Sequence, residues 1–561
     1  MAEYLSPGVY VEEFDSGGQP LAGVSTSTAG FIGLAQRGPT EGLPVLVTSM
    51  NDFKRNFGSY LSENQFGSYR YLAYAVEHYF VNGGSRAYIM RVAPNDAKPA
   101  SGSAGTLTLT ARNPGAWGNA VQAVLEPSSK AKTQIYEVVG DAKYRVKNGA
   151  GFNAGDVVAF EASGEKQYGK VISSRDNVIE LEAALEGDVV DGGLLPAKVL
   201  STCEFTLTVA YGDEVEQFEK CSLNIAAANY VEKAAARSNL VAVTAAPSDA
   251  AVHPLETLGA STISLSGGSD GSAGALSAAD FMGEDNGPGK RTGIQAFIDN
   301  DQASLMAVPG VTEPAVQLAL VAHCENLGSR FAILDIPREK TKVPDVLTHR
   351  DIFDSSYAAM YNPWLQVFDP LEKRNIFIPP SGSIAGVYAR SDSTRGVEKA
   401  PANEVIRGCT GLEVQYNKGE QDILNPKGVN LIRSFSGQGI RVWGARTTSS
   451  NALWKYINIR RLFIFLEESI KAGTNWVVFE PNDERLWARV HRTIDAFLTR
   501  VWRGGALMGS SPGEAFYIDI SRNTMTQDDI DNGRLICVIG VAPVKPAEFV
   551  IFRITQKTNE Q

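Results

Sequence analysis

The sequence has no long apolar run and no recognisable export signal. Its longest apolar stretches, such as Leu462–Leu466, fall far short of the roughly 18 residues that cross a bilayer. Its first residues lack a basic segment followed by an apolar one, which is the pattern of a secretory signal. We therefore expect a soluble protein with no direct membrane insertion.

Cysteine and histidine are both scarce, with five residues each. No CxxC pair occurs and no two histidines stand four residues apart, so the common spacings of metal ligands are missing. His323 and Cys324 are neighbours, but adjacent side chains point in different directions. We expect free, buried thiols and neither a metal nor a cofactor. The five cysteines are Cys203, Cys221, Cys324, Cys409 and Cys537.

A basic excess is also missing, because 52 Lys and Arg stand against 63 Asp and Glu, giving a net charge of −11. Proteins that bind nucleic acids generally carry a basic surplus, so we expect no nucleic-acid partner. The hydrophobic fraction of 43% and the charged fraction of 20% are ordinary for globular proteins. A chain of 561 residues then predicts roughly three or four domains.

Strand-like and helical patterns alternate in two parts of the chain. Val45–Val47 and Tyr88–Met90 flank a helical pattern at 69–80, and apolar runs at 304–308 and 331–335 flank another at 315–327. Between 106 and 224, short β-branched strands are separated by Gly, Asp and Asn turns, and 135–200 could form a small barrel. We predict a mixed α/β, multidomain fold with a β-rich inserted module. Its expected parts are an N-terminal arm and linker (1–24), an α/β core (25–105 and 225–390), the inserted module (106–224), a C-terminal domain (391–545) and a C-terminal arm (546–561).

Strand patterns also stand at both ends of the chain. Val9 and Val11 alternate with Tyr10 and Glu12, and Phe549–Thr555 has high β propensity. A Gly/Ser/Thr-rich connector follows the first strand. A lone terminal strand needs a partner, because its backbone groups are otherwise unsatisfied.

One motif favours an enzyme. Gly267–Gly271 fits the GxSxG pattern with Ser269 as the nucleophile, and it follows the strand-like Ile263–Leu265. The chain contains 54 glycines, so this pattern arises easily by chance, and its surroundings resemble a Ser/Gly-rich loop. A serine hydrolase is therefore kept only as the alternative to a non-enzymatic protein.

A dense run of aromatic and charged residues fills the C-terminal third. It begins with Val442–Thr447 and continues through Trp454–Tyr456 and Arg460–Arg461 to Val478–Asp483 and Pro546–Phe549. This order of motifs closely resembles that of contractile tail sheath proteins. The resemblance covers most of the chain but leaves out 125–205. It extends through Ser6–Glu13, Asn82–Gly84, Asn113–Asn119, Pro363–Trp364, Pro379–Gly382 and Ala400–Asn403.

The resemblance implies a structural protein that polymerises into a helical sheath around a rigid inner tube. Contraction, triggered at the baseplate, would drive the tube through a target envelope. The implied partners are other copies of the chain, the inner tube protein, and baseplate and terminal cap proteins. The motifs match the single-chain form of sheath, assembled in the bacterial cytoplasm and belonging to a phage tail or a bacterial contractile injection system. In that arrangement, 106–224 faces outward and 391–545 faces the tube.

The family also exchanges terminal arms between neighbouring subunits, which builds small intersubunit β-sheets. Strand addition would satisfy the backbone groups of both arms, and the flexible links would let each subunit swing as a rigid body. The expected arm residues are Val9, Tyr10, Val11, Glu12, Phe549, Val550, Ile551, Phe552 and Ile554.

A helix is predicted over 485–503, with an arginine stripe on one side. At about 100° per residue, the other four arginines of the stripe lie within roughly −20° to +60° of Arg485. Like charges on one stripe repel and need an acidic counterpart, so we expect this face to contact the inner tube. The arginine stripe consists of Arg485, Arg489, Arg492, Arg500 and Arg503; the opposite, apolar face consists of Trp487, Val490, Ile494, Phe497, Leu498 and Val501.

Overall fold

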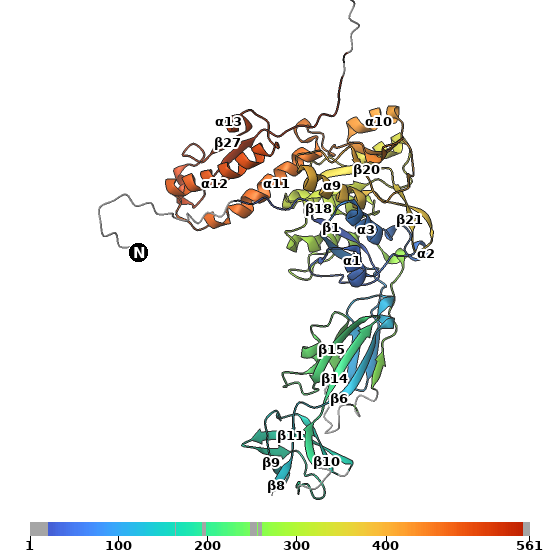
Figure 1. Ribbon diagram of the computed structural model, residues 1–561, viewed down its shortest axis with the longest axis vertical. Coiled ribbons are helices and arrows are strands. Elements are labelled where there is room, and N and C mark those ends of the chain that lie inside the picture. Colours follow the sequence, from blue (N-terminus) through green and yellow to red (C-terminus); the bar gives the residue numbers. More distant parts are fainter. Residues whose placement is uncertain are drawn as a thin grey trace, which may run out of the picture.

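The computed structural model describes residues 21–162, 164–192, 198–246, 255, 261–551 and 553. Figure 1 shows a central α/β body, a β-sandwich that projects from it, a distal β-module beyond the sandwich, and a helical unit on another side of the body. No helix in the described part of the chain is long and apolar enough to span a bilayer.

The body is built on a nine-stranded sheet whose central strands are parallel. Strands β1, β19 and β20 are buried along their whole length, because helices cover both faces of the sheet. One face is covered by α3 (Leu72–Asn82) and α9 (Ser381–Arg395), and the other by α7 (Pro314–Leu327) and α8 (Val343–Arg350). The strand order is β2 (Val45–Val47), β3 (Ala87–Val92), β1 (Ala29–Leu34), β18 (Leu305–Ala307), β19 (Phe331–Asp335), β20 (Ala358–Asn362), β25 (Val429–Phe435), β26 (Gly439–Val442) and β23 (Glu404–Val405).

Helices α3 and α9 pack unusually closely against each other. A Cβ at Gly382 or Gly386 would collide with the backbone of Ala75 or Tyr79, so glycine is required at both contacts. Smaller elements complete the body: α1 (Met50–Phe57), α2 (Glu63–Phe66), α6 (Ala278–Met282), α10 (Lys418–Leu424), and the small sheet of β22 (Arg374–Ile378), β21 (Leu365–Asp369) and β24 (Gly411–Leu412).

The body sheet extends beyond residue 390, where the sequence pattern placed the end of the α/β core. β25 pairs in parallel with β20, and β26 and β23 continue the sheet. The strand pattern of β25 was hidden in the sequence because Asn430, Arg433 and Ser434 interrupt its apolar residues. Asn430 is fully buried and donates to the carbonyls of Met360 and Arg446, so it serves as a polar core residue.

The β-sandwich is wider than the expected module of 106–224. It runs from β4 to β17, and leucines such as Leu109, Leu125 and Leu207 fill its core. One sheet has the order β15 (Glu214–Cys221), β14 (Glu204–Tyr211), β6 (Gln122–Ser128) and β17 (Thr262–Ser264), and the other β16 (Val241–Ala245), β5 (Leu107–Ala111) and β4 (Ser101–Ala104); α4 (Val231–Ala235) packs beside them.

The distal module lies within 129–203, between strands β6 and β14 of the sandwich, and has a hydrophobic core of its own. Its two edge strands, β7 and β8, are separated in the chain by Gln134 alone, so the seven-stranded sheet curls back on itself. The order is β7 (Lys132–Thr133), β13 (Val199–Thr202), β10 (Val157–Ala162), β11 (Glu165–Arg175), β12 (Val178–Leu181), β9 (Lys143–Val146) and β8 (Ile135–Gly140).

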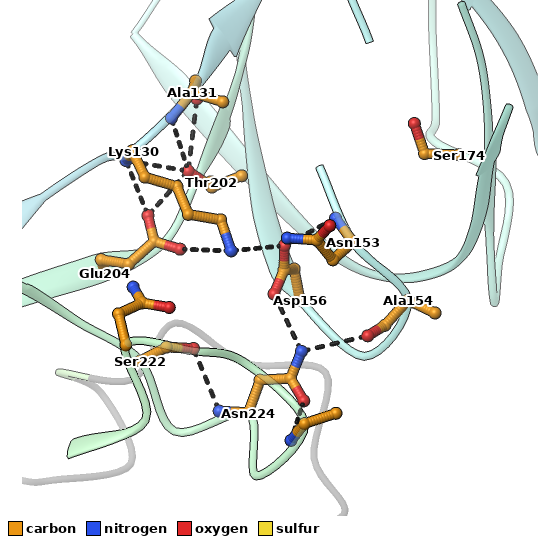
Figure 2. Close-up of polar contacts among 12 residues, drawn as sticks. Lys130, Ala131, Asn153, Ala154, Asp156, Ser174, Thr202, Glu204, Ser222 and Asn224 are labelled. Carbon is orange, nitrogen blue, oxygen red and sulfur yellow. Dashed lines mark hydrogen bonds and ion pairs between the residues drawn. The ribbon is translucent and has the colours of Figure 1, made fainter. Parts of the chain in front are cut away.

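A buried polar joint holds the distal module on the sandwich (Figure 2). The Lys130 ammonium lies 2.8 Å from the Asp156 carboxylate and 3.5 Å from that of Glu204, and both acids are 1% exposed. Thr202 Oγ1 donates to Glu204, and Asn224 Nδ2 donates to Asp156. Burial raises the pKa of Glu204, while hydrogen bonds from Thr202 and Lys130 oppose the shift. These ion pairs and hydrogen bonds fix the direction in which the distal module projects from the sandwich.

The helical unit shares one long helix with the body. Ile457 and Ile464 of α11 (Ile457–Gly473) pack into the body, whereas Leu462 and Leu466 pack against α12 (Glu484–Arg503). A helix with two buried faces joins the two units into one rigid piece. The unit also contains α13 (Pro512–Ala515), β27 (Phe516–Asp519), α14 (Gln527–Asp531) and β28 (Val538–Val541).

Candidate assembly surfaces

The root of the C-terminal arm is pinned to the body through Glu548. Its carboxylate accepts two hydrogen bonds from the Arg446 guanidinium, at 2.8 and 2.7 Å, and one each from Asn425 and Tyr456. Lys455 lies 3.7 Å away. Burial alone would raise the pKa of Glu548, but these partners lower it to about 2. The chain therefore leaves the body from a fixed point.

Immediately after this anchor the chain turns apolar and exposed. Phe549, Val550 and Ile551 are 72%, 69% and 78% exposed, and no strand forms in this part of the described chain. Three consecutive large apolar side chains in solvent indicate a segment that is covered by something else. Phe552 and Ile554 lie outside the described residues.

Acidification is expected to release this anchor. The pKa of Glu548 is about 2 in the folded protein and 4.5 as its ordinary value, so the stabilisation is complete above about pH 4.5 and is lost as the pH falls toward 2. At neutral pH, Glu548→Gln should mimic the loss. We expect amide hydrogen exchange of 543–551 to rise in the variant, and unchanged exchange there would contradict the anchor.

A small sheet in the helical unit has two open edges. β27 and β28 pair only with each other among the described residues, in the register Phe516↔Val541 to Asp519↔Val538. A two-stranded sheet is marginal alone and offers unpaired backbone groups on both sides. Sequence reasoning missed this sheet, because its strands are only four residues long.

The chain enters the described region at the helical unit. Leu21 is buried against Gly473 of α11, where any larger residue would collide with it. Arg500 of α12 donates to the Leu21 carbonyl, and the Val24 amide donates to Ser469. The expected arm residues Val9, Tyr10, Val11 and Glu12 precede this point and lie outside the described residues.

Helix α12 has the two faces that its sequence predicts. Its N-cap Asp483 accepts from the Leu486 amide, and the predicted apolar face is buried apart from Val501, which is half-buried. All five residues of the arginine stripe are exposed. Arg489 stacks 4.4 Å above Trp476 and lies 3.6 Å from Glu480, and Arg500 holds Leu21. Within the described chain, Arg485, Arg492 and Arg503 make no hydrogen bond or ion pair through their side chains.

The Ser269 loop lacks the geometry of a nucleophile elbow. Ser269 pairs with Lys98 through an isolated bridge, and its hydroxyl accepts from the Gly271 amide in a local turn. No helix follows the serine directly, and no described histidine contacts it. The hydrolase alternative therefore gains no support.

Comparisons with known proteins identify the family. Residues 285–448 match the phage tail sheath protein central domain and 449–557 match the phage tail sheath C-terminal domain, together just under half of the chain. A prophage major tail sheath protein of Pseudomonas aeruginosa is 28% identical over 278 residues, which is 47% of this chain and 69% of the relative. The chain belongs to the contractile tail sheath family.

Solved structures show the same fold over nearly the whole sheath subunit. The sheath of an extracellular contractile injection system, PVC, in the contracted state is 21% identical with a TM-score of 0.55, covering 99% of each chain. The helical sheath of the anti-feeding prophage in the contracted state is 23% identical with a TM-score of 0.54, covering 98% of this chain and 99% of the other. These structures share the mixed α/β multidomain fold of this protein, and the family matches make it a tail sheath protein of the kind found in phages and contractile injection systems.

Proposed function

We propose that the subunit polymerises into a helical sheath by exchanging its terminal arms, and that this sheath surrounds and propels an inner tube. The proposal rests on two features that occur together in one subunit. One is an exposed apolar arm that is anchored at Glu548, and the other is a two-stranded sheet with open edges. Both halves of a strand-addition contact are present, and neither is paired in this way among the residues that the structure describes. Negative-stain microscopy of the purified protein should show hollow striated tubes; a permanent monomer would contradict the proposal.

Open head-to-tail contacts produce a helical tube rather than a closed ring. In such a tube, Phe549–Ile551 with Phe552 and Ile554 from one neighbour, and Val9–Glu12 from another, add to the edges of β27–β28. A buried ion pair between Arg461 of α11 and Asp392 of α9, together with the packing of α11 on both units, makes the body and the helical unit a single piece. Subunits can therefore rotate as rigid bodies during contraction while the arms stay paired.

The remaining partners follow from this role. They are the inner tube protein, baseplate proteins at one end and cap proteins at the other, with neither nucleic acid nor a membrane. The subunit is non-enzymatic. Assembly takes place in the bacterial cytoplasm, and the mature particle is a phage tail or an injection machine.

The arginine stripe on α12 is the proposed contact with the inner tube. Its five cations are exposed, three of them are unpaired within the described chain, and the net charge of the whole protein is −11. Figure 1 shows α12 on the helical unit, well away from the projecting sandwich and distal module. Tube-facing and outward-facing surfaces can thus occupy different sides of the subunit. Exposed ion pairs contribute only about 0–1 kcal/mol each, which suits a sheath that must release its tube.

Charge reversal at Arg485 and Arg492 should impair assembly around the tube. These two arginines have no partner in the described chain, so Arg485→Glu/Arg492→Glu disturbs no internal contact, whereas changing Arg500 would also free Leu21. We expect at least a ten-fold loss of co-sedimentation with tube protein at low salt, the effect of several weak ion pairs together. Empty contracted tubes should still form.

A matched control is Lys147→Glu/Arg175→Glu, which makes the same charge change on exposed residues of the distal module. The control should co-sediment like wild type. If the α12 variant also co-sediments like wild type at low salt, the arginine stripe faces something other than the tube.

The distal module is proposed to be an outward decoration that assembly does not need. Ser128 and Glu204 are register partners on adjacent antiparallel strands, so replacing 129–203 with Asn-Gly converts β6 and β14 into a hairpin. This variant should stay folded and form normal tubes, as seen by microscopy. Excision of 125–205 would instead remove Leu125 and Phe205 from the sandwich core and unfold it. Failure of the 129–203 variant to assemble, although folded, would place the module in the lattice.

A further inference from the structure

A pocket of about 470 Å³ opens on the body beside the root of the C-terminal arm, and arm exchange makes no use of it. It is lined by residues 350–354 at the end of α8, 426–428 before β25 and 446–455 after β26. Four lining side chains are basic and two are acidic, so the lining carries a net positive charge in a protein whose total is −11. Such a pocket attracts anions. The basic residues are Arg350, Lys427, Arg446 and Lys455, and the acidic residues are Asp351 and Asp354.

Arg350, the last residue of α8, is a buried cation without a counter-ion in the described chain. It is 9% exposed, and its guanidinium donates only to two neutral carbonyls, those of Phe353 at 2.5 Å and Thr448 at 2.7 Å. Its Nε has no hydrogen-bond partner among the described residues. Burial lowers the pKa of Arg350, and the charges of Asp351 and Asp354 oppose this shift only in part. A cation that has lost its hydration in this way is stabilised by an anion.

Two other arginines are buried without a carboxylate partner, but they differ from Arg350 in their surroundings. Arg91 donates to the carbonyls of three residues, and Arg330 donates to two carbonyls and contacts the ring of His323. Both hold loops together inside the fold. Of these three arginines, only Arg350 lines the pocket.

A glycine at position 428 leaves the guanidinium of Arg350 uncovered. Gly428 has a φ of +82°, and a Cβ at this position would lie 2.6 Å from the Thr447 carbonyl oxygen and 3.5 Å from both Nε and Nη2 of Arg350. Any larger residue would therefore strain the turn and cover the guanidinium. The preceding residue, Lys427, is exposed, and its ammonium makes no hydrogen bond or ion pair within the described chain.

The nearby carboxylates are engaged elsewhere or face solvent. Asp354 is exposed and accepts hydrogen bonds from the amide and the hydroxyl of Ser450, at 2.8 and 2.6 Å. Asp351 is exposed, and neither acid forms an ion pair with Arg350 or Lys427 among the described residues. Glu548 is held by the Arg446 guanidinium and lies 3.7 Å from Lys455. The charges of Arg350 and Lys427 thus stay uncompensated.

We propose that this pocket binds a small oxyanion, a phosphate or carboxylate group, between Arg350 and Lys427. A guanidinium has five N–H donors, of which Arg350 uses two, and its planar fork fits both kinds of group. A free anion and an acidic side chain of a neighbouring copy present the same chemistry. Because Arg446 and Lys455 contact both the pocket and Glu548, the negative charge of Glu548 opposes binding of the anion.

Calorimetric titration of the full-length, unassembled subunit with inorganic phosphate, and separately with malonate, tests the site at constant ionic strength. We expect saturable binding of one anion per subunit with a dissociation constant of about 1 mM or lower, and a thermal unfolding midpoint that rises with the anion concentration. Lys427→Glu should weaken binding about ten-fold, because repulsion replaces an attraction. The matched control Lys418→Glu makes the same change on an exposed lysine outside the pocket and should bind like wild type.

Two further variants separate the site from a folding defect. Arg350→Gln should abolish binding, whereas Glu548→Gln should tighten it several-fold, and a damaged fold would not produce a gain. The absence of saturable binding of either anion to wild type would overturn the proposal, and so would equal binding by Lys427→Glu and Lys418→Glu.

Assembled tubes identify the source of the anion. Tubes that bind phosphate like the unassembled subunit support a free anion as the ligand, and tubes that have lost the binding seen in the unassembled subunit support a carboxylate from a neighbouring copy. The titration of the unassembled subunit needs no tube, so failure of the proposed sheath function and failure of this site are distinguishable.

Discussion

Truncation of the sheath subunit after Glu548 is expected to abolish polymerisation completely while leaving a folded monomer. Phe549–Ile551 are largely exposed and belong to no core cluster of the described subunit, so their loss removes little buried surface. Glu548 remains to hold its anchor with Arg446. Size-exclusion chromatography, the thermal unfolding midpoint and electron microscopy together measure this outcome. Deletion of residues 1–20 should have the same effect, because the other half of the exchange is then lost.

Shorter truncations provide the control for both ends. Truncation after Lys557 retains the C-terminal strand pattern, and deletion of residues 2–5 retains Val9–Glu12, so both should give normal tubes. Normal tubes from the truncation after Glu548, or from deletion of residues 1–20, would rule out arm exchange as the basis of the lattice.

Breaking the buried ion pair between Asp392 and Arg461 should strongly destabilise the subunit. The pair joins α9 of the body to α11, its side chains are 7% and 3% exposed, and the guanidinium contacts both carboxylate oxygens, one of them at 2.9 Å. Thr26 also donates to Asp392. Asp392→Ala leaves a buried guanidinium without its counter-ion, which costs about 3–5 kcal/mol. The shift of the first unfolding transition in urea measures the effect.

Two comparisons separate the ion pair from general disruption. Asp392→Leu/Arg461→Leu removes both charges and should recover most of the lost stability. Lys471→Gln breaks an exposed pair with Glu468 on the same helix and should cost under about 0.5 kcal/mol. An Asp392→Ala variant no less stable than Lys471→Gln would show that α11 is held by apolar packing alone.

The sequence correctly predicted those helices and strands whose apolar residues recur at one regular spacing. The helix expected at 485–503 is observed at Glu484–Arg503, because charged and apolar residues alternate there with the helical repeat on opposite faces. The helix expected at 315–327 is observed at Pro314–Leu327, and Phe331–Asp335 is a buried parallel strand, as its unbroken apolar run indicated. The cysteines are free, as expected, but only Cys203, Cys221 and Cys324 are buried; Cys409 and Cys537 are half-buried, so the prediction of buried thiols was wrong for these two.

Long-range contacts could not be predicted in this way. Arg446 and Glu548 both stand in motifs that resemble the sheath family, yet nothing in either motif indicates that the two side chains meet. The same holds for Leu21 against Gly473, and for the Lys130 joint between the β-sandwich and the distal module. β25 was missed because its polar core residue Asn430 is satisfied only by partners from β20 and the loop after β26.

The central claim is that neighbouring subunits complete the β27–β28 sheet with their terminal arms. A cryo-electron microscopy reconstruction of the assembled tube tests it most directly. We predict a four-stranded sheet in every helical unit, with Val9–Glu12 supplied by one neighbour and Phe549–Ile554 by another. A reconstruction in which β27–β28 stays two-stranded, or in which the added strands come from the same subunit, would contradict the account.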